Sequence, residues 1–410
     1  MKKIRFIACL LLCTLVFTGC SFGTPQADYA TKEDLEALKD LQSSEAGDSY
    51  NVNISAAENT SLLGAAKALL SVVSITCNFE ELYTSGWYGS HQTTLRTTTY
   101  YGSGVIYKLD KAKGDAYVIT NYHVVYNSAS VADNRISRDI SLFLYGQENE
   151  QDAIKATYVG GSAYYDIAVL KVSGSAILKE SIATEATLAN SDKVSVLDTA
   201  IAIGNPAGMG ISATAGRVSV DSETIALSIT GGSYVNMRVM RVDTAVNGGN
   251  SGGGLFDEKG NLIGIVNAKI TDSSIENIAY AIPSNVAKHL AESILSSDKG
   301  VATRCILGVT PKVVSSKAVY DTETGKISIV EVVGIASISE GSVAIGVFEE
   351  GDIIKKMIID GEEINITREF QVRESMFAAR VGSTVIFKIE RNGSPLEVSF
   401  TITEDMVIEF

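Results

Sequence analysis

The segment NGGNSGGGLF, residues 247–256, places one serine among five glycines. Successive glycines allow a turn that directs neighbouring backbone N–H groups into one concavity, where they can stabilise a developing oxyanion. A serine in such a loop becomes a nucleophile when a base lies within reach of its hydroxyl. The segment therefore predicts Ser251 as a nucleophile, with the N–H groups of Gly249 and Ser251 as its oxyanion hole.

The same glycines could instead form a flexible turn or hold a phosphate. A phosphate-binding loop would continue with Lys-Ser or Lys-Thr and open a helix. This loop continues through Leu255 and Phe256 into the apolar run LIGIVNAKI, which is typical of a strand. The sequence therefore favours acyl-transfer chemistry over phosphate binding.

A base and an orienting acid are needed beside Ser251. The chain has three histidines, and only His123, in VITNYHVV, ends a strand-like run; His91 lies in a polar stretch and His289 on an expected helix, where solvent exposure is the ordinary expectation. Asp166, in YYDIAVLKV, directly precedes an apolar strand, where a carboxylate needs a dedicated partner. We expect His123 as the base and Asp166 as the residue that orients it. A structural histidine and a strand-capping aspartate remain the alternatives for each residue alone.

Many short apolar runs, separated by Gly, Ser, Asn and Asp, precede these residues, lie between them and follow them. They predict an all-β barrel or sandwich of roughly 230 residues. A helix is expected over SNVAKHLAESILSS, after Pro283. From Val301 a second unit begins, with about five strands and a helix over TREFQVRESMFAAR. The fold class expected is mainly β.

The N-terminus MKKIRFIACLLLCTLVFTGC has a cationic start, a short apolar run and small residues before a cysteine. This is typical of an export signal over residues 1–20, and its end resembles a bacterial lipobox in which Cys20 is lipidated. A plain secretory signal with an incidental Cys20 is the alternative. Residues 21–64 are polar and acidic, which indicates a tether. The net charge of −14 argues against nucleic acid as a partner. Cys77 and Cys305 are expected as separate buried thiols rather than a disulfide.

The order His, Asp, Ser in TNYHVV, YYDIAVLKV and GNSGG resembles the trypsin-fold serine proteases of the HtrA/DegP family, as do GSGVI, IGNPAG, TAGRVS and AYAIPSN in the same order. The resemblance implies a double β-barrel protease domain over residues 65–298 and a PDZ domain over residues 301–410. Its carboxylate-binding loop would be Ile306, Leu307, Gly308 and Val309. The resemblance also implies a homotrimer, unfolded polypeptides as substrates, peptide C-termini as PDZ ligands, and no cofactor or metal.

In trypsin-like folds the residue six before the nucleophile forms the base of the primary specificity pocket. Here Ala245, followed by Val246, suggests an apolar pocket for small or medium aliphatic side chains. Gly248 and Gly254 stand where the family usually has prolines. Because two rings are lost, we hypothesise a loosened loop whose oxyanion hole orders only when substrate or a PDZ ligand binds.

The sequence thus predicts an exported, lipid-anchored serine endopeptidase that degrades misfolded or unfolded envelope proteins. Two alternatives remain open at this point. One is a catalytically silent chaperone or peptide-binding sensor, and the other is a regulatory protease that cuts one specific protein.

Overall fold

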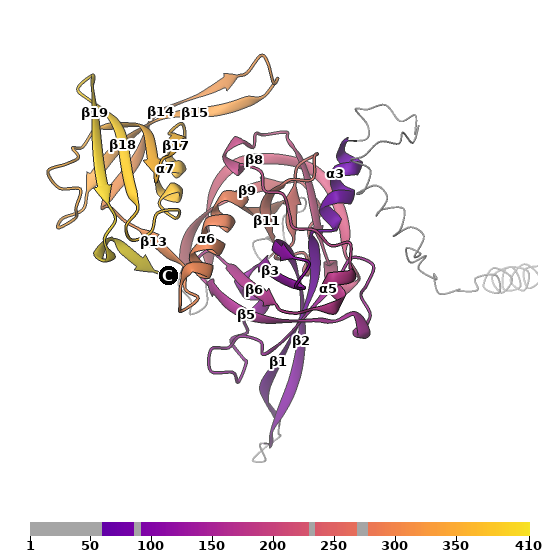
Figure 1. The fold of residues 1–410 in the computed structure, drawn as a ribbon. Helices are drawn as coiled ribbons and strands as arrows, with labels where there is room; N and C mark the ends of the chain where they lie inside the picture. The colour runs from indigo at the N-terminus through magenta and orange to yellow at the C-terminus, as the bar shows by residue number, and fades with distance from the viewer. Residues whose placement is uncertain (1–59, 86–91, 229–233, 269–277) are drawn as a thin grey trace, which may run out of the picture. The chain divides into compact units, whose positions relative to one another are not determined.

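The computed structural model describes residues 60–85, 92–228, 234–268 and 278–410 (Figure 1). The predicted signal peptide with Cys20, most of the predicted tether and His91 lie outside the described residues. The described chain forms two closed barrels, followed by a smaller mixed unit (Figure 1). The expectation of a mainly β protein is confirmed.

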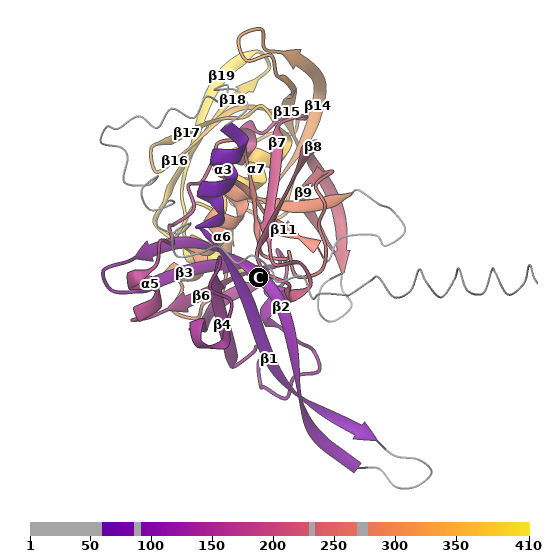
Figure 2. The ribbon, with the colours of Figure 1, turned by 90° about the vertical axis from the view of Figure 1, so that its right-hand side faces the viewer.

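Six antiparallel strands close the first barrel in the order β1-β2-β3-β6-β5-β4. Their bounds are β1 (Val72–Ser85), β2 (Gln92–Asp110), β3 (Asp115–Thr120), β4 (Asp139–Leu144), β5 (Ile154–Ser162) and β6 (Ile167–Val172). The inward residues, such as Ile75, Leu142 and Leu170, are buried, and closure leaves no unpaired strand edge in the barrel wall. β1 and β2 continue beyond the barrel as a two-stranded ribbon (Figure 2), on which the paired residues Leu82 and Leu95 are exposed.

The second barrel has the strand order β10-β11-β12-β9-β8-β7. Its strands are β7 (Thr199–Gly204), β8 (Ser212–Ser228), β9 (Tyr234–Val242), β10 (Gly254–Phe256), β11 (Leu262–Asn267) and β12 (Ala279–Pro283). Helix α6 (Ser284–Ser296) begins directly after Pro283, as predicted, and packs on β11. Its buried stripe repeats every three to four residues, at Val286, Leu290 and Ile294, which explains why this polar-looking segment is a helix with one apolar face.

Short helices precede the first strand or lie between strands. They are α3 (Thr60–Leu69), α4 (Tyr122–Val125), α5 (Ala176–Glu180) and the 3₁₀ helices η1 (Glu150–Asp152), η2 (Ser191–Lys193), η3 (Pro206–Gly208) and η5 (Glu404–Met406). Within the parts of the chain described above, none of the helices has both the length and the apolar character to cross a bilayer.

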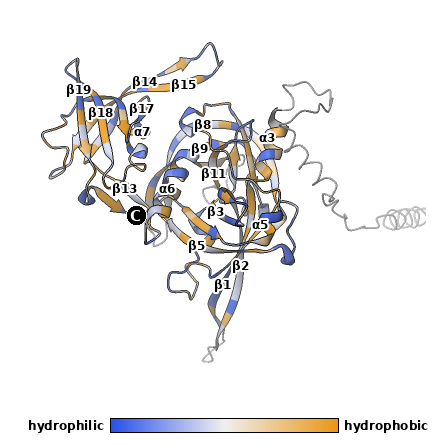
Figure 3. Ribbon diagram, viewed as in Figure 1, coloured by the Kyte–Doolittle hydropathy of each residue, from blue (hydrophilic) through white to orange (hydrophobic). Residues whose placement is uncertain are grey.

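The C-terminal unit has a sheet in the order β14-β15-β16-β18-β19, with β17 beside β16, and a separate pair formed by β13 and β20. The bounds are β13 (Thr303–Cys305), β14 (Val309–Tyr320), β15 (Ile327–Ile338), β16 (Ile353–Ile359), β17 (Glu362–Asn365), β18 (Thr384–Arg391), β19 (Ser394–Thr401), β20 (Val407–Glu409) and helix α7 (Glu369–Ser375). Figure 3 shows apolar and polar residues mixed along these strands, as expected for a sheet with one buried face. Met357 and Phe387 lie in its buried core.

Candidate active site

His123 and Asp166 meet because the strands beside them are paired. β3 ends at Thr120, which lies opposite Ala168 of β6, so the residues after β3 and before β6 are neighbours. His123 follows in α4, and its ring Nδ1 lies 2.6 Å from Asp166 Oδ2. The backbone N–H of His123 donates to Asp166 Oδ1 at 2.9 Å. One residue thus engages both carboxylate oxygens and fixes the ring to them.

The hydrogen bonds around Asp166 determine which nitrogen of the His123 ring carries the proton. Asp166 is 4% exposed, and Asn267 Nδ2 donates to its Oδ2 at 2.8 Å. Asn121 Nδ2 donates to the Asp166 backbone carbonyl at 2.9 Å, which anchors the turn before β6. An ionised carboxylate can only accept hydrogen bonds, so Nδ1 carries the imidazole proton. Nε2 is therefore the acceptor nitrogen of the neutral ring.

The loop around Ser251 is held by its carbonyl groups. The backbone carbonyls of residues 247–251 all accept hydrogen bonds. Those of residues 247, 248 and 250 accept from the N–H groups of Asn250, Ala207 and Gly253, respectively. The Gly249 carbonyl accepts from the Ser103 hydroxyl and the Ser251 carbonyl from the Ser103 N–H. The backbone N–H groups of Gly249 and Ser251 donate to none of the described residues. Because every carbonyl of residues 247–251 is turned toward the protein, these two N–H groups remain for a ligand.

Two glycines are required by the conformation of this loop. Gly249 has φ 98°, and a Cβ there would lie 2.2 Å from the Asn205 carbonyl oxygen. Gly252 has φ 83°, and a Cβ there would lie 2.2 Å from the Ser103 carbonyl oxygen. Left-handed backbone and close approach both exclude a side chain at these positions. The sharp turn around Ser251 therefore requires glycine at residues 249 and 252.

A cleft of about 680 Å³ is lined by residues from both barrels. His123 comes from the first barrel and Ser251 and Gly249 from the loop of the second, while Tyr100, Tyr101 and Ala207 complete much of its lining. We call this the active-site cleft. Within the described chain, the Ser251 hydroxyl accepts from the Ala268 N–H at 3.2 Å rather than bonding the imidazole. Hydrogen bonds between nucleophile and base are often long without substrate and tighten when it binds.

The remaining predicted site residues have different outcomes. Ala245 and Val246 are not among the residues that line the active-site cleft, and residues 269–277, which follow Ala268 of that lining, are not described. The apolar specificity pocket therefore stays a prediction. Ile306, Leu307, Gly308 and Val309 all line a separate pocket of the C-terminal unit.

The two glycines that depart from the family pattern are physically unlike. A Cβ at Gly248 would meet nothing within 4 Å. Gly254 belongs to β10, where it lies opposite Ile203 and Ile265, and a Cβ there would lie 2.2 Å from the Phe256 ring. The absence of a side chain at residue 254 therefore makes room for a buried aromatic ring, so the hypothesis of a loosened loop applies to Gly248 alone.

Sequence reasoning assigned no role to Ser103 or Asn267. Both are fully buried polar residues in otherwise apolar strand segments, GSGVI and GIVNAKI. A buried polar side chain needs a hydrogen-bond partner, so an amide inside a run of six buried residues was a usable signal. The partner itself, a carbonyl or carboxylate from another element, could not be identified from the sequence.

The two described thiols are not alternative nucleophiles. Cys77 and Cys305 are free and buried, as expected. Burial raises the pKa of Cys77 to about 12 and that of Cys305 to about 11. Since the thiolate is the reactive form, both stay inert at neutral pH.

Two closed six-stranded barrels with a His–Asp pair and a glycine-bounded serine in one cleft define a trypsin-like serine endopeptidase. Residues 102–265 match the family described as the trypsin-like peptidase domain. The chain is 32% identical over 302 residues to the serine protease Do-like HtrA of Lactococcus lactis subsp. lactis (strain IL1403), covering 71% of this chain and 68% of the relative. It is also 32% identical over 338 residues to the serine protease Do-like HtrA of Bacillus subtilis (strain 168), covering 80% and 69%.

The chain therefore belongs to the HtrA family of serine proteases. A further relative is the periplasmic pH-dependent serine endoprotease DegQ of Escherichia coli (strain K12), 32% identical over 308 residues, with 73% of this chain and 59% of the relative covered. Among solved structures, an HtrA-type protease AlgW with tripeptide superposes with a TM-score of 0.51 at 24% identity, covering 84% of this chain and 96% of that one. At this identity the likeness supports the fold alone.

Proposed function

We propose that this protein is an exported endopeptidase that degrades misfolded or unfolded polypeptides outside the cytoplasm, with Ser251, His123 and Asp166 as its catalytic triad. The observation that carries the assignment is the 2.6 Å contact between His123 Nδ1 and Asp166 Oδ2, beside a cleft that also contains Ser251. The Escherichia coli relative, a periplasmic endoprotease, supports the proposed compartment.

In the proposed reaction, Ser251 Oγ attacks the carbonyl carbon of the scissile peptide bond while His123 Nε2 takes the hydroxyl proton. Asp166 stabilises the imidazolium and holds the ring with Nε2 toward the cleft. The carbonyl oxygen becomes an oxyanion that accepts hydrogen bonds from the N–H groups of Gly249 and Ser251. His123 then protonates the leaving amine, and water hydrolyses the acyl-enzyme by the same steps. One oxyanion donor is worth about 10² to 10³ in kcat.

The C-terminal unit supports the second half of the proposal. We assign residues 65–298 to the protease domain and residues 301–410 to a PDZ domain that binds peptide C-termini. The N–H groups of Leu307 and Gly308 donate to none of the described residues, and both residues line a pocket beside the free edge of β14. Free backbone donors at the end of an open strand edge suit a terminal carboxylate.

Three further elements of the proposal extend beyond the domains. Cys20 would carry the lipid that tethers the chain to the outer face of a membrane. Three copies would form a homotrimer, for which the exposed Leu82, Tyr83 and Leu95 of the β1–β2 ribbon offer apolar contact area. Ala245 and Val246 would select small or medium aliphatic side chains at the cleaved bond.

Hydrolysis of unfolded casein by the full-length chain tests the proposed function. Replacement Ser251→Ala should reduce turnover at least about 10⁴-fold, because the nucleophile is lost. Ser181→Ala is the matched control, since Ser181 is also buried but donates to the Leu178 carbonyl. Equal turnover by the Ser251→Ala protein contradicts the assignment, and no turnover by the unaltered chain favours the catalytically silent alternative.

A further inference from the structure

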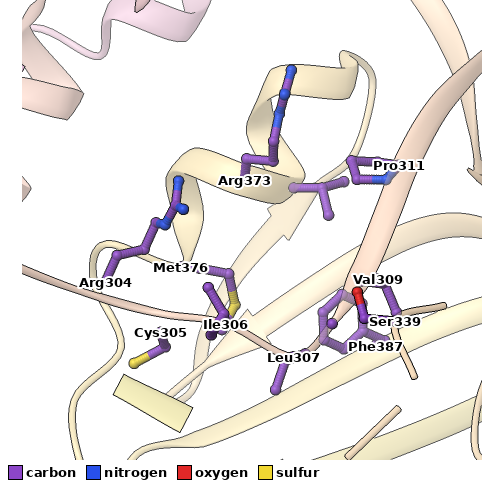
Figure 4. Close-up of a pocket in the computed structure, with 12 residues that line it drawn as sticks. Arg304, Cys305, Ile306, Leu307, Val309, Pro311, Ser339, Arg373, Met376 and Phe387 are labelled. Carbon is purple, nitrogen blue, oxygen red and sulfur yellow. The ribbon is translucent and has the colours of Figure 1, made fainter. Parts of the chain in front are cut away.

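The C-terminal unit contains a groove between the edge strand β14 and helix α7. It has a volume of about 260 Å³ (Figure 4). Leu307, Val309 and Pro311 line it from the loop and β14, and Val372 and Met376 line it from α7 and its C-terminal end, with Phe387 of β18 in the lining too. We call this the peptide groove. β14 pairs with β15 on one side and is the first strand of its sheet, so its other edge is free for an added strand.

The direction of each backbone group along this edge follows from one hydrogen bond. The Ser339 N–H donates to the Gly308 carbonyl at 2.7 Å, so that carbonyl points toward β15. In a trans peptide the next N–H, that of Val309, points the opposite way, toward the free edge. Along a strand the outward groups recur at every second residue. Val309 and residue 311 therefore face an incoming ligand.

Residue 311 is a proline, which has no N–H to donate. Its partner residue confirms its orientation, because Ile335, opposite Pro311, donates to the Asp352 carbonyl and accepts from the Gly351 N–H on the far side of β15. The ladder irregularity between Thr310 and Pro311 places its extra residue on β15, so the alternation on β14 is unbroken. Over its first three residues, the free edge of β14 thus offers the N–H and carbonyl of Val309 and the carbonyl of Pro311. The next outward residue is Val313, directly before the ladder irregularity between Val313 and Ser315.

A ligand bound by its carboxylate runs antiparallel to β14, because the free N–H groups of Leu307 and Gly308 lie at the start of that strand. Its last residue then pairs with Val309, and its third residue from the end faces Pro311. The N–H of that third residue can donate to the Pro311 carbonyl. The carbonyl of the same ligand residue faces Pro311, which has no N–H, so one hydrogen bond between the ligand and β14 is missing.

The charge around the peptide groove fits an anionic chain end. Among its twelve lining residues are Arg304 and Arg373 and no aspartate or glutamate, although the whole chain has a net charge of −14 (Figure 4). Arg373 pairs with Glu369 at 2.7 Å, whereas Arg304 donates to the Tyr165 hydroxyl at 3.3 Å and forms no salt bridge with a carboxylate of the described residues. A local positive field in an acidic protein attracts a carboxylate.

From these observations we infer that the peptide groove binds a free polypeptide C-terminus with an apolar last residue, and that Pro311 restricts recognition to the final two or three residues. The inference rests on the proposed binding of peptide C-termini and adds a limit to it. Affinity comes from the carboxylate, the hydrogen bonds to Val309 and the last side chain. A longer peptide reaches Val313 only across the missing hydrogen bond at Pro311, and the ladder is irregular directly after Val313, so its gain is small. The ligands are therefore defined by their exposed ends rather than by an extended sequence.

Peptide binding to the full-length chain carrying Ser251→Ala, which prevents cleavage, tests this inference. The probes are valine-ending peptides of two, three, five and eight residues with free carboxylates, measured by competition against a fluorescent octapeptide. On the unaltered groove, affinity should differ less than about threefold between three and eight residues. Pro311→Ala adds the missing donor and should tighten the octapeptide by roughly fivefold, the worth of one net hydrogen bond, without changing the dipeptide.

Pro395→Ala, at the exposed end of β19 on the other edge of the sheet, is the matched control and should change neither affinity. A steep gain with length on the unaltered groove, or no selective gain from Pro311→Ala, overturns the inference and leaves C-terminus binding intact. If an amidated octapeptide binds as well as the free acid, the proposed C-terminus recognition itself fails. Should Pro311→Ala unfold, the length series on the unaltered protein decides alone.

Discussion

Ser103 Oγ donates to the Gly249 carbonyl at 2.7 Å, across the boundary between the two barrels. The Ser103 N–H also donates to the Ser251 carbonyl at 2.8 Å. One buried residue of β2 therefore holds the carbonyl groups of both residues whose N–H groups are proposed to form the oxyanion hole. The N–H groups of these two residues belong to the preceding peptide planes, whose carbonyls Ala207 and Gly253 hold. Ser103 therefore positions the loop from the adjoining peptide planes, without touching substrate.

Replacement Ser103→Ala should lower kcat by about 10- to 100-fold with little change in KM, because one of the two hydrogen bonds from Ser103 to the loop is lost and the transition state is destabilised more than the bound substrate. The measurement is steady-state hydrolysis of a peptide substrate, with Ser181→Ala as the buried-serine control. A rise in KM at constant kcat would mean that Ser103 serves substrate binding instead.

Replacement Asp166→Asn should reduce kcat by about 10⁴-fold at neutral pH, since an amide in place of the carboxylate no longer fixes the tautomer that leaves Nε2 free. The new amide keeps one acceptor oxygen, so its NH₂ group would face either the backbone N–H of His123 or the side of the pair to which Asn267 Nδ2 donates. Hydrolysis rates at pH 7 provide the measurement. Asp321→Asn, in the exposed turn after β14, is the control and should retain full activity.

The two unusual glycines should respond oppositely to alanine. Gly254→Ala should cost about 1 to 3 kcal/mol of unfolding free energy, because its methyl group would overlap the buried Phe256 ring. Gly248→Ala should stabilise by about 0.4 to 1 kcal/mol, because its Cβ meets open space and the unfolded chain loses freedom. Urea unfolding of both variants measures the difference. Equal effects would show that the Phe256 contact relaxes at no cost.

The stability of the chain should fall in mild acid through His289. Burial lowers the pKa of His289, with Lys288 and Arg380 adding to the shift and Glu292 and Glu362 opposing it. His289 therefore binds a proton less readily in the folded state than in the unfolded state, where a histidine titrates at about pH 6.5. This contribution to stability is present above that pH and is lost as the pH falls toward the folded pKa.

His289→Gln should remove that part of the acid sensitivity. The variant should lose less unfolding free energy than the unaltered chain between pH 7.5 and 5.5, and the difference between the two proteins isolates His289 from the other titrating groups. Parallel pH profiles would contradict the assignment. The expected solvent exposure of His289 is thus only half right, since the ring on α6 is partly buried.

The fold class could be predicted from the sequence more directly than the site residues. Short apolar runs were enough to predict a mainly β protein, because closed barrels bury alternate residues of every strand. His123 and Asp166 could be paired only by elimination and resemblance, since the contact depends on Thr120 lying opposite Ala168 across β3 and β6. Ser103 could not be assigned at all, because its acceptor lies 146 residues away along the chain.

The anchoring of the Ser251 loop by Ser103 has a consequence for biogenesis. The proposed nucleophile, Ser251, belongs to one barrel, while the proposed base, His123, and Ser103 belong to the other. A chain with only its first barrel folded has no complete triad, and the second barrel alone has none either. Hydrolysis thus requires that both barrels are folded and docked, so activity is coupled to completion of the fold.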